Sequence, residues 1–447
     1  MCGIAGFYKP SIHIKDYART IKQMLSFIQH RGPDEAGYYL DNHLAMGTTR
    51  LSIIDIQNAT QPLSDFSKRY WICYNGELYN YIELKKELQH KGVIFCTNSD
   101  TEVVLQAWIY WKEECLSRFN GAFAFAIYDT QEVTLFLARD RYGKRPLFYC
   151  EQNGEFVFAS EMKAFLGYNK LSFDWDPQQL TSIFALWTPL PEQTGFKNIK
   201  QLPMGEYLIV RGERACLTRS SYTELNFESR LFVQTESDAI EQTRDLLTES
   251  VKLRLRSDVE TGVYLSGGLD SAIITQLASE ISSQQVKTYS VEFEDKEFDE
   301  SNFQKSLVKH LDTKHSSIAI TAKDISENFP TAIFHGEVPV FRTAFVPMFL
   351  LSKKVQKEGI KVILSGEGAD EAFLGYDLFK ETLLRIAWNK ISDQERKNKI
   401  DKIYPYLNHF NSASQLMGLY QQFSEEKCLG YFHMKYDSRM VIFQQDY

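Results

Sequence analysis

Short hydrophobic runs separated by turn residues dominate the chain up to about residue 210. They are rich in β-branched and aromatic residues and are closed by Gly, Asn or Asp, which is typical of strands. The clearest runs are AMGTTRLSII, RYWICYN, GAFAFAIYD, VTLFLAR and EFVFAS. Apolar residues recur at helical spacing in the segments 17–29, 82–91 and 101–111. The mixture predicts an α+β sandwich over residues 2–210.

The pattern changes after a polar stretch, residues 211–235, which we interpret as a linker. From residue 236 onwards, the short apolar runs GVYL, KTYSVEF, SSIAI and KVILS are each followed by a segment of helical period. This alternation predicts a parallel α/β sheet in a second domain, residues 236–447. From about residue 371 the pattern is almost wholly helical.

Composition narrows the class of protein. The 447 residues are 44% hydrophobic and 24% charged with a net charge of −8, and neither a membrane-length apolar run nor a basic stripe is present. We therefore expect small-molecule substrates, with no nucleic-acid or membrane partner. The start, MCGIAGFYKP, lacks the pattern of a secretory signal, so the cytoplasm is the expected compartment. The seven cysteines form no CxxC pair, which argues against disulfide frameworks and zinc sites.

Cys2 stands apart from the other cysteines because it directly follows Met1. Removal of that methionine leaves a thiol and an α-amine on one residue, and an α-amine with an ordinary pKa near ~8 can accept the thiol proton near neutral pH. This combination can attack a carboxamide without a histidine. The plain alternative is that many chains carry a cysteine at the second position.

An attack on a carboxamide also needs donors for the oxyanion and charges that hold the substrate. Asn75 and Gly76 in YNGELYN can supply a side-chain amide and a backbone N–H, although Asn-Gly is also a common hairpin turn. Arg50 and Asp100 are suitable partners for the α-carboxylate and α-ammonium of glutamine. Lone charges of this kind are more often solvated or capping residues.

The motifs MCGIAGF, QHRGPDEAG, TTRLSIID, YNGELYN, SDTE and FNGAFAFAIYD together resemble the class II glutamine amidotransferase domain. The resemblance covers about the first 165 residues and implies an αββα fold of the N-terminal nucleophile hydrolase type. It also implies that Cys2 is the nucleophile and that Asn75 and Gly76 form the oxyanion hole. The glutamine-binding residues that it implies are Arg50, Leu51, Ser52, Ile53, Ile54, Asn75, Gly76, Glu77 and Asp100.

The second domain carries two glycine-containing turns, each between a predicted strand and a helix. In SGGLDS, Ser266, Gly267 and Gly268 allow phosphate oxygens to approach the backbone at a helix start. In GEGADE, Glu367, Asp370 and Glu371 lie beside the turn. Mg²⁺ prefers such hard oxygen ligands, so Asp270 and Asp370 could hold it against ATP. Ordinary acidic capping of a helix is the alternative.

This pair of motifs, with KTYSVEF and FDES between them, resembles the synthetase domain of glutamine-hydrolysing asparagine synthetases, which is ATP-pyrophosphatase-like. The resemblance implies that Glu367 supports acyl-adenylate formation and that Arg342, in RTAFVPMFLLSK, lies near the acceptor. The ATP-binding residues that it implies are Leu265, Ser266, Gly267, Gly268, Asp270, Ser271, Val291, Ser365 and Gly366. Asp437, Arg439 and Met440 echo only the start of a further family motif.

Together these observations predict an ATP- and Mg²⁺-dependent amide ligase that takes ammonia from glutamine at Cys2 and transfers it to an adenylated carboxylate, with aspartate as the first candidate. Three alternatives stay open: another carboxylate acceptor in a natural product or peptide, a glutaminase with a degenerate second domain, and a non-catalytic sensor of glutamine or nucleotide. The sequence does not fix the oligomeric state, and a homodimer is one option.

Overall fold

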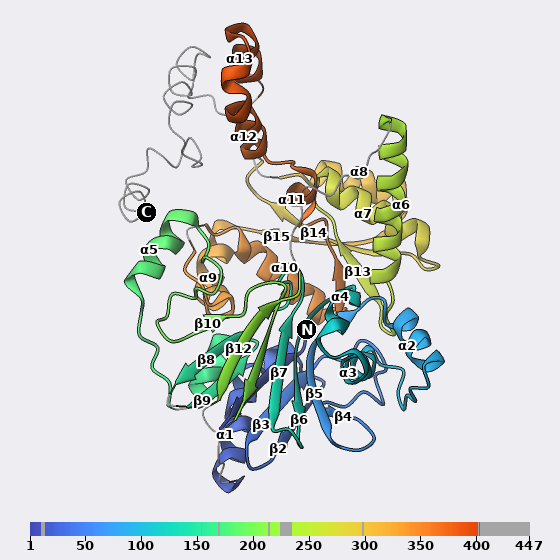
Figure 1. Cartoon of the computed structure of the whole chain (residues 1–447). Helices are drawn as coiled ribbons and strands as arrows, with labels where there is room; N and C mark the ends of the chain where they lie inside the picture. The colour runs from blue at the N-terminus through green and yellow to red at the C-terminus, as the bar shows by residue number, and fades with distance from the viewer. Residues whose placement is uncertain are drawn as a thin grey trace. The chain divides into compact units, whose positions relative to one another are not determined.

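The computed structural model describes residues 1–400 and 402, except residues 10–13, 153, 169, 213–214, 224–234, 297–298 and 341. The chain divides into two compact units. The first comprises Met1–Gly267 and Ile274–Leu364, and the second comprises Gly268–Ile273 and Ser365–Tyr447. The three sheets of the described chain all belong to the first unit (Figure 1).

Two six-stranded antiparallel sheets are formed by the first half of the chain. One has the order β10-β8-β9-β1-β3-β2 and the other β12-β11-β7-β6-β5-β4. The strands are β1 (Gly3–Tyr8), β2 (Glu35–Leu40), β3 (Leu44–Arg50), β4 (Leu63–Ser64), β5 (Tyr70–Leu78), β6 (Gly121–Asp129), β7 (Thr134–Arg139), β8 (Phe148–Gln152), β9 (Glu155–Ala159), β10 (Lys200–Gln201), β11 (Glu206–Arg211) and β12 (Cys216–Ser221).

Strand β6 shows why the two sheets stack face to face. Successive side chains of a strand point to opposite faces, and GAFAFAIYD alternates small with large residues. Ala124 and Ala126 lie in the core between the two sheets, while Phe123 and Phe125 lie in a second core against helices. The small residues let the sheets approach each other, and the aromatic residues fill the space under the helices.

Helices cover the outer face of each sheet. A helical layer formed by α2 (Tyr81–His90), α3 (Asp100–Trp111) and α4 (Cys115–Arg118) packs on the sheet that contains β6. The apolar face of α1 (Ile14–Phe27) packs on the sheet that contains β1, together with the 3₁₀ segment η3 (Met162–Tyr168). Ile21, Met24 and Leu25 are buried in that core as their spacing predicts. The αββα architecture is therefore confirmed.

The stretch that we interpreted as a linker differs in one respect from that interpretation. Within it, β12 pairs in antiparallel fashion with β11 and extends the second sheet beyond residue 210. Its side chains are mostly exposed, as expected for an edge strand with one solvated face. Strand β12 therefore needs no hydrophobic run. Its polar composition is the reason that the sequence suggested a linker.

The second half of the chain contributes a parallel sheet with the order β15-β14-β13-β16. Its strands are β13 (Thr261–Tyr264), β14 (Lys287–Phe293), β15 (Lys314–Ile320) and β16 (Val362–Leu364). Core residues of α6 (Glu236–Arg254) and α7 (Leu269–Ile281) pack with β13, and those of α10 (Phe345–Lys357) pack with β14. All four predicted strands are confirmed, and so is the parallel arrangement.

The remaining helices complete the two units. In the first unit they are α5 (Pro177–Leu186), α8 (Ser301–Leu311) and α9 (Ala322–Gly336). In the second they are α11 (Ala369–Phe373), α12 (Asp377–Ala387) and α13 (Asp393–Ile400), in agreement with the helical pattern after residue 371. Asp437, Arg439 and Met440 lie outside the described residues.

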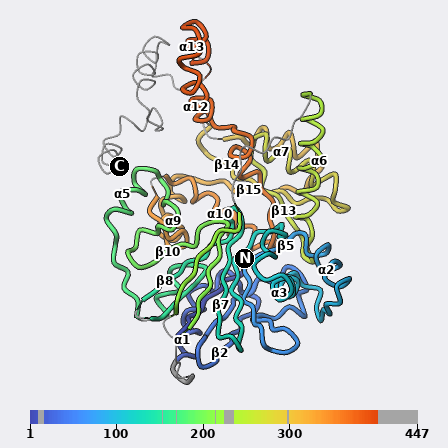
Figure 2. The backbone as a smooth tube through the Cα atoms, in the orientation of Figure 1, coloured from blue at the N-terminus to red at the C-terminus, as the bar shows by residue number. Residues whose placement is uncertain are grey.

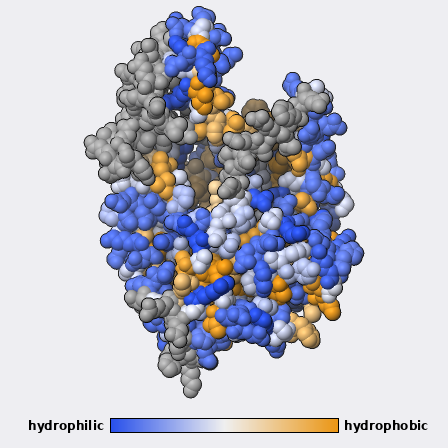
Figure 3. Space-filling model, viewed as in Figure 1, coloured by the Kyte–Doolittle hydropathy of each residue, from blue (hydrophilic) through white to orange (hydrophobic). Residues whose placement is uncertain are grey.

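Among the described residues, none of the helices combines the length and the apolar character that crossing a membrane requires. The face drawn in Figure 3 is mainly hydrophilic, and the hydrophobic residues visible on it form small scattered groups.

Candidate active site

Cys2 immediately precedes β1 and is buried. Because β1 pairs with β3 so that Gly3 lies opposite Thr49, Cys2 faces the loop that follows Arg50. The Cys2 thiol lies 3.8 Å from the Leu51 carbonyl oxygen as donor, and its Sγ lies 3.4 Å from the Leu51 nitrogen as acceptor. Strand pairing thus places the predicted nucleophile against the loop predicted to bind glutamine.

The surroundings of Cys2 determine its protonation state. Burial raises the pKa of the Cys2 thiol, while the amino-terminal charge, the Leu51 backbone and Arg50 act in the opposite direction. Burial also lowers the pKa of the terminal α-amine of Met1 to about 5, and the charges of Arg31 and Arg145 contribute to this decrease. With Met1 in place, burial thus favours both the protonated Cys2 thiol and the neutral Met1 amine. The α-amine that would act as the base belongs to Cys2 and is exposed only after Met1 is removed, so its role stays a prediction.

Asn75 and Gly76 lie inside β5, opposite Ala124 and Phe123 of β6. The alternative of a hairpin turn at this position is therefore wrong. Asn75 is fully buried, and its Nδ2 and Oδ1 have no hydrogen-bond partner among the described residues. Strand β1 packs on β5, and the N-terminus lies near the end of β5 (Figure 2). An unpaired buried amide costs free energy unless something binds it, and an oxyanion is a suitable partner.

We expect Asn75→Ala to lower kcat for glutamine hydrolysis by about 100- to 1000-fold, which is the usual cost of removing one oxyanion-hole donor. Steady-state release of glutamate measures this effect. Asn80→Ala serves as the control, because Asn80 hydrogen-bonds Arg118 and Asn120 on the exposed surface. Equal activity of the two variants would remove Asn75 from the oxyanion hole.

Arg50 organises the predicted glutamine loop. Its Nη1 donates to Glu35 and to the Ile56 carbonyl, and its Nη2 donates to the carbonyls of Ile54 and Asp55. Arg50 is buried, so these contacts fix the loop without solvent competition. These four bonds use Nη1 and Nη2, so Nε is the nitrogen that could donate to a substrate carboxylate. The expected contact between Arg50 and glutamine stays a prediction.

Two contacts tie the same loop to the start of the parallel sheet. The Asp55 N–H donates to Asp258, which precedes β13, at 2.7 Å. Lys361, which precedes β16, donates to Asp34 at 2.7 Å, and Asp34 accepts the Ser52 N–H at 2.8 Å. The loop that carries Ser52, Ile53 and Ile54 thus lies against the amino ends of β13 and β16.

Asp100 is buried at the first position of α3, and its Oδ2 accepts the Leu78 N–H at 3.0 Å. The capping alternative does not hold for this residue, because Ser99 accepts the Glu102 N–H as the N-cap. Burial raises the pKa of Asp100 to about 7, and the nearby charge of Glu77 contributes. Glu77, Asp100 and Cys2 therefore share one electrostatic neighbourhood.

The raised pKa predicts how glutamine binding depends on pH. Asp100 is charged above pH 7 and neutral below it, and only the charged form can pair with the α-ammonium of glutamine. We expect the Kd for glutamine to be about tenfold higher at pH 6 than at pH 8. Calorimetry on Cys2→Ala protein separates binding from catalysis. Asp100→Asn should bind weakly at both pH values, and a pH-independent Kd in the Asp100 protein would contradict this assignment.

The carboxyl ends of the parallel strands carry the second group of predicted residues. Leu265, directly after β13, is buried and donates its N–H to the Tyr289 carbonyl at 2.8 Å. Val291 lies in β14, and Ser365 directly follows β16. The Gly267 N–H donates to the Glu300 carboxylate at 2.8 Å. A backbone N–H of the SGGLDS loop thus already binds an anionic group, as expected of a phosphate-binding loop.

In the second unit, Gly366 of GEGADE packs against Asp270 and Ser271 of SGGLDS. A Cβ on Gly366 would lie only 2.8 Å from the Ser271 nitrogen and 2.9 Å from the Cβ of Asp270, so only glycine allows this approach. Gly268 and Ser271 belong to the same turn, in which the Ser271 hydroxyl donates to the Gly268 carbonyl at 3.1 Å. The two motifs, far apart in sequence, therefore meet.

Acidic residues stand in both motifs. Asp270 lies in the first turn of α7 and Asp370 in the first turn of α11. Glu371 accepts the Tyr376 hydroxyl at 3.1 Å, and the charges of Asp370 and Glu367 help to raise the pKa of that tyrosine, after burial and Glu371. Within the described residues, no group of three or more potential ligands is present. Mg²⁺ often takes only one or two protein carboxylates and completes its shell with phosphates and water, so its binding by Asp270 and Asp370 stays a prediction.

Arg342 is separated in sequence from both SGGLDS and GEGADE. It is exposed, and its guanidinium lies 4.2 Å from the ring centroid of Trp187, in a cation–π contact. Nothing in the described contacts links it to SGGLDS or GEGADE, and its role in acceptor binding stays a prediction.

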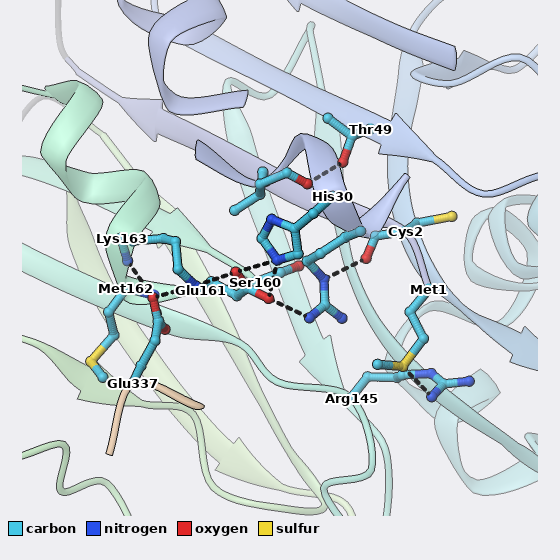
Figure 4. Close-up of polar contacts among 12 residues, drawn as sticks. Met1, Cys2, His30, Thr49, Arg145, Ser160, Glu161, Met162, Lys163 and Glu337 are labelled. Carbon is cyan, nitrogen blue, oxygen red and sulfur yellow. Dashed lines mark hydrogen bonds and ion pairs between the residues drawn. The ribbon is translucent and has the colours of Figure 1, made fainter. Parts of the chain in front are cut away.

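Sequence reasoning assigned no role to a chain of buried charges beside Cys2. It consists of Arg31, Glu161, Lys163 and Glu337 (Figure 4). Arg31 stands in QHRGPDEAG, one of the motifs that carry the family resemblance, so that motif was the available signal. Glu337 contributed no signal, because only the fold brings it to this site.

Comparison with known proteins covers both halves of the chain. Residues 1–223 match the glutamine amidotransferase domain, and residues 242–436 match asparagine synthase. A putative glutamine-hydrolysing asparagine synthetase 2 of Methanocaldococcus jannaschii is 30% identical over 90% of this chain and 83% of its own length. The chain belongs to the glutamine-hydrolysing asparagine synthetase family. This membership confirms the resemblance drawn from the motifs.

Other relatives are longer than this chain. Asparagine synthetase 1 of Bacillus subtilis is 38% identical over 89% of this chain and 62% of its own length, and amidase chyE of Penicillium rubens is 30% identical over 86% and 60%. The chain thus spans about three fifths of these relatives. A solved glutamine phosphoribosylpyrophosphate amidotransferase of B. subtilis aligns with 72% of this chain and 81% of its own at a TM-score of 0.39 and 19% identity.

Proposed function

We propose that this chain is a glutamine-dependent amide ligase that forms asparagine from aspartate, with consumption of ATP and release of AMP and pyrophosphate. The observation that carries the glutaminase half is the buried Cys2 at the glutamine loop, with the unpartnered amide of Asn75 on the adjacent strand β5. Family membership and the meeting of SGGLDS with GEGADE support the ligase half.

In the glutaminase half, the Cys2 thiol transfers its proton to the α-amine and its sulfur attacks the carboxamide carbon of glutamine. Asn75 and the Gly76 N–H stabilise the oxyanion. Collapse of this intermediate expels ammonia and leaves a thioester, which water hydrolyses to glutamate and the free thiol. In this proposal, Arg50 and Asp100 hold the α-carboxylate and α-ammonium of the substrate, as salt bridges to fixed charges do.

In the ligase half, the β-carboxylate of aspartate attacks the α-phosphorus of ATP to give an acyl-adenylate and pyrophosphate, and ammonia then displaces AMP. Ser266, Gly267 and Gly268 would hold phosphate oxygens through backbone N–H groups. Leu265, Val291, Ser365 and Gly366 would contact the nucleotide, and Glu367 would support adenylate formation. Asp270 and Asp370 would hold Mg²⁺, which supplies positive charge against the phosphates.

Product analysis tests the proposal. The purified chain is incubated with aspartate, glutamine and MgATP, and asparagine, glutamate, AMP and pyrophosphate are quantified. Equal amounts of asparagine, AMP and pyrophosphate are expected. Glutamate without asparagine or AMP would instead identify a glutaminase, and no glutamate at all would indicate a non-catalytic sensor.

A second acceptor class deserves a parallel assay, because a relative at 30% identity carries the name amidase. Consumption of glutamine and ATP that depends on a peptide or natural-product carboxylate, with aspartate inactive, would favour that class. A cytoplasmic location and the lack of nucleic-acid or membrane partners stay predictions of the sequence, and a homodimer stays one option for the oligomeric state.

A further inference from the structure

A carboxylate from the asparagine synthase half clamps the backbone of the glutaminase half. Glu337 follows α9 directly, and its two carboxylate oxygens accept the N–H groups of Met162 and Lys163 at 2.6 and 2.7 Å. Lys163 also pairs with Glu337 through its side chain at 2.9 Å. Both side chains are nearly inaccessible, with exposed fractions of 9% for Glu337 and 4% for Lys163. Three short contacts therefore converge on one buried carboxylate.

The chain of charges continues from Lys163 to the nucleophile. Lys163 pairs with Glu161 at 2.5 Å, and Glu161 pairs with Arg31 at 2.7 Å. Arg31 donates from Nε to the carbonyl oxygen of Cys2 at 2.9 Å. Figure 4 shows Glu337, Lys163 and Glu161 in succession on the way to Cys2. Opposite charges alternate along the whole path, so each side chain is fixed by both of its neighbours.

The ionised state of Glu161 fits this arrangement. Burial alone would raise the pKa of the Glu161 carboxyl, but His30, Arg31 and Lys163 together hold it well below its ordinary value. His30 also packs edge-on against His335 of α9, with 4.5 Å between ring centroids. The end of α9 thus contacts this path at two points, through His335 and Glu337.

We propose that Glu337 is a positioning residue for glutamine hydrolysis, which holds the Cys2 backbone in place through Lys163, Glu161 and Arg31. The inference rests on the proposed glutaminase activity and assigns part of that site to the other half of the chain. Small displacements of a nucleophile are costly, since about 1 Å of misplacement can cost 100-fold in rate. Loss of the clamp should therefore lower kcat and leave glutamine binding by the loop after Arg50 intact.

Glu337→Gln in the full chain tests this proposal. Glutamine keeps the size of the side chain, but its amide nitrogen then faces a backbone N–H and cannot accept its hydrogen bond. We expect kcat for glutamine hydrolysis to fall at least tenfold, with KM for glutamine changed less than twofold. If Glu337 had a purely structural role, its replacement would not lower kcat selectively while leaving KM for glutamine unchanged.

Asp129→Asn provides the matched control. Asp129 is also a buried carboxylate that accepts two backbone N–H groups, from Gln131 and Glu132, and pairs with a cation, Arg69, at 2.7 Å. It lies at the far end of β6 from the residues that face Asn75 and Gly76. Asp129→Asn should lower the melting temperature and leave kcat and KM unchanged. An equal loss of kcat in this variant would overturn the proposal.

A double variant distinguishes a loss of Cys2 positioning from a loss of folding stability. Glu337→Gln leaves Lys163 with one carboxylate fewer, and a buried charge that loses its partner destabilises a fold. Lys163→Met combined with Glu337→Gln removes both charges, so the melting temperature should recover while kcat stays low. Recovery of kcat together with the melting temperature would overturn the inference, and so would a wild-type kcat in folded Glu337→Gln. If the wild-type chain does not hydrolyse glutamine at Cys2, the proposed function is overturned, and the inference about Glu337 falls with it.

Discussion

Cys2→Ala is expected to lower glutamine hydrolysis by at least ~1000-fold, because it removes the thiol that would form the thioester. The other described cysteines are no substitute. Cys73, Cys115 and Cys150 are buried in hydrophobic surroundings with raised pKa values, and Cys96 and Cys216 lie exposed elsewhere. Glutamate release measures the loss, and glutamine-dependent asparagine formation should disappear with it.

Ammonia supplied in the buffer bypasses the missing nucleophile. With ammonium chloride, aspartate and MgATP, Cys2→Ala should form asparagine at the wild-type rate, because SGGLDS and GEGADE are untouched. Cys73→Ala serves as the control for a removed thiol and should retain both activities. Loss of ammonia-dependent synthesis in Cys2→Ala would argue against two separate reaction centres.

Asp270→Asn is expected to produce the opposite result. It removes one of the two carboxylates proposed to hold Mg²⁺ against ATP, at the turn where a Cβ on Gly366 would lie 2.9 Å from the Cβ of Asp270. Metal-assisted charge stabilisation contributes several kcal/mol to reactions of this kind. ATP–pyrophosphate exchange should therefore fall by at least ~100-fold, while glutamine hydrolysis stays at the wild-type rate.

The matched control for Asp270 is another acidic residue at the start of a helix. Asp377 lies in the first turn of α12, and its carboxylate pairs with Lys380 at 2.7 Å. Asp377→Asn should leave exchange intact. Exchange that persists in Asp270→Asn would remove this residue from the metal site, and a Mg²⁺ titration of MgATP binding in both variants would show whether metal affinity had changed.

The sequence was most informative where chemistry and local pattern coincide. The hydrophobic run GAFAFAIYD and the helical spacing in α1 identified elements that the structure contains, because both faces of the strand and one face of the helix are buried. The motifs assigned Cys2 and Leu51 to one glutamine site and Asp270 and Gly366 to one ATP site, and the members of each pair lie close together in the structure.

Other features could not be predicted from the sequence. Strand β12 forms through its pairing with β11, and its side chains are mostly exposed. Its sequence can therefore be polar, and no hydrophobic signal marks it as a strand. Asn-Gly at positions 75 and 76 has a turn composition, yet tertiary pairing with β6 extends the strand through it. Glu337 lies more than 170 positions from Lys163, and a lone glutamate after a helix has no local signature of a buried ion pair.

The parallel strands β13 and β16 have a consequence for the route that ammonia would take in the proposed mechanism. The glutamine loop lies at their amino ends through Asp258 and Lys361, while SGGLDS and GEGADE begin at their carboxyl ends. Since β13 has four residues, its two ends lie about 13 Å apart. Bulk water would protonate ammonia over that distance and abolish its nucleophilicity, so efficient transfer requires a sheltered route alongside these strands.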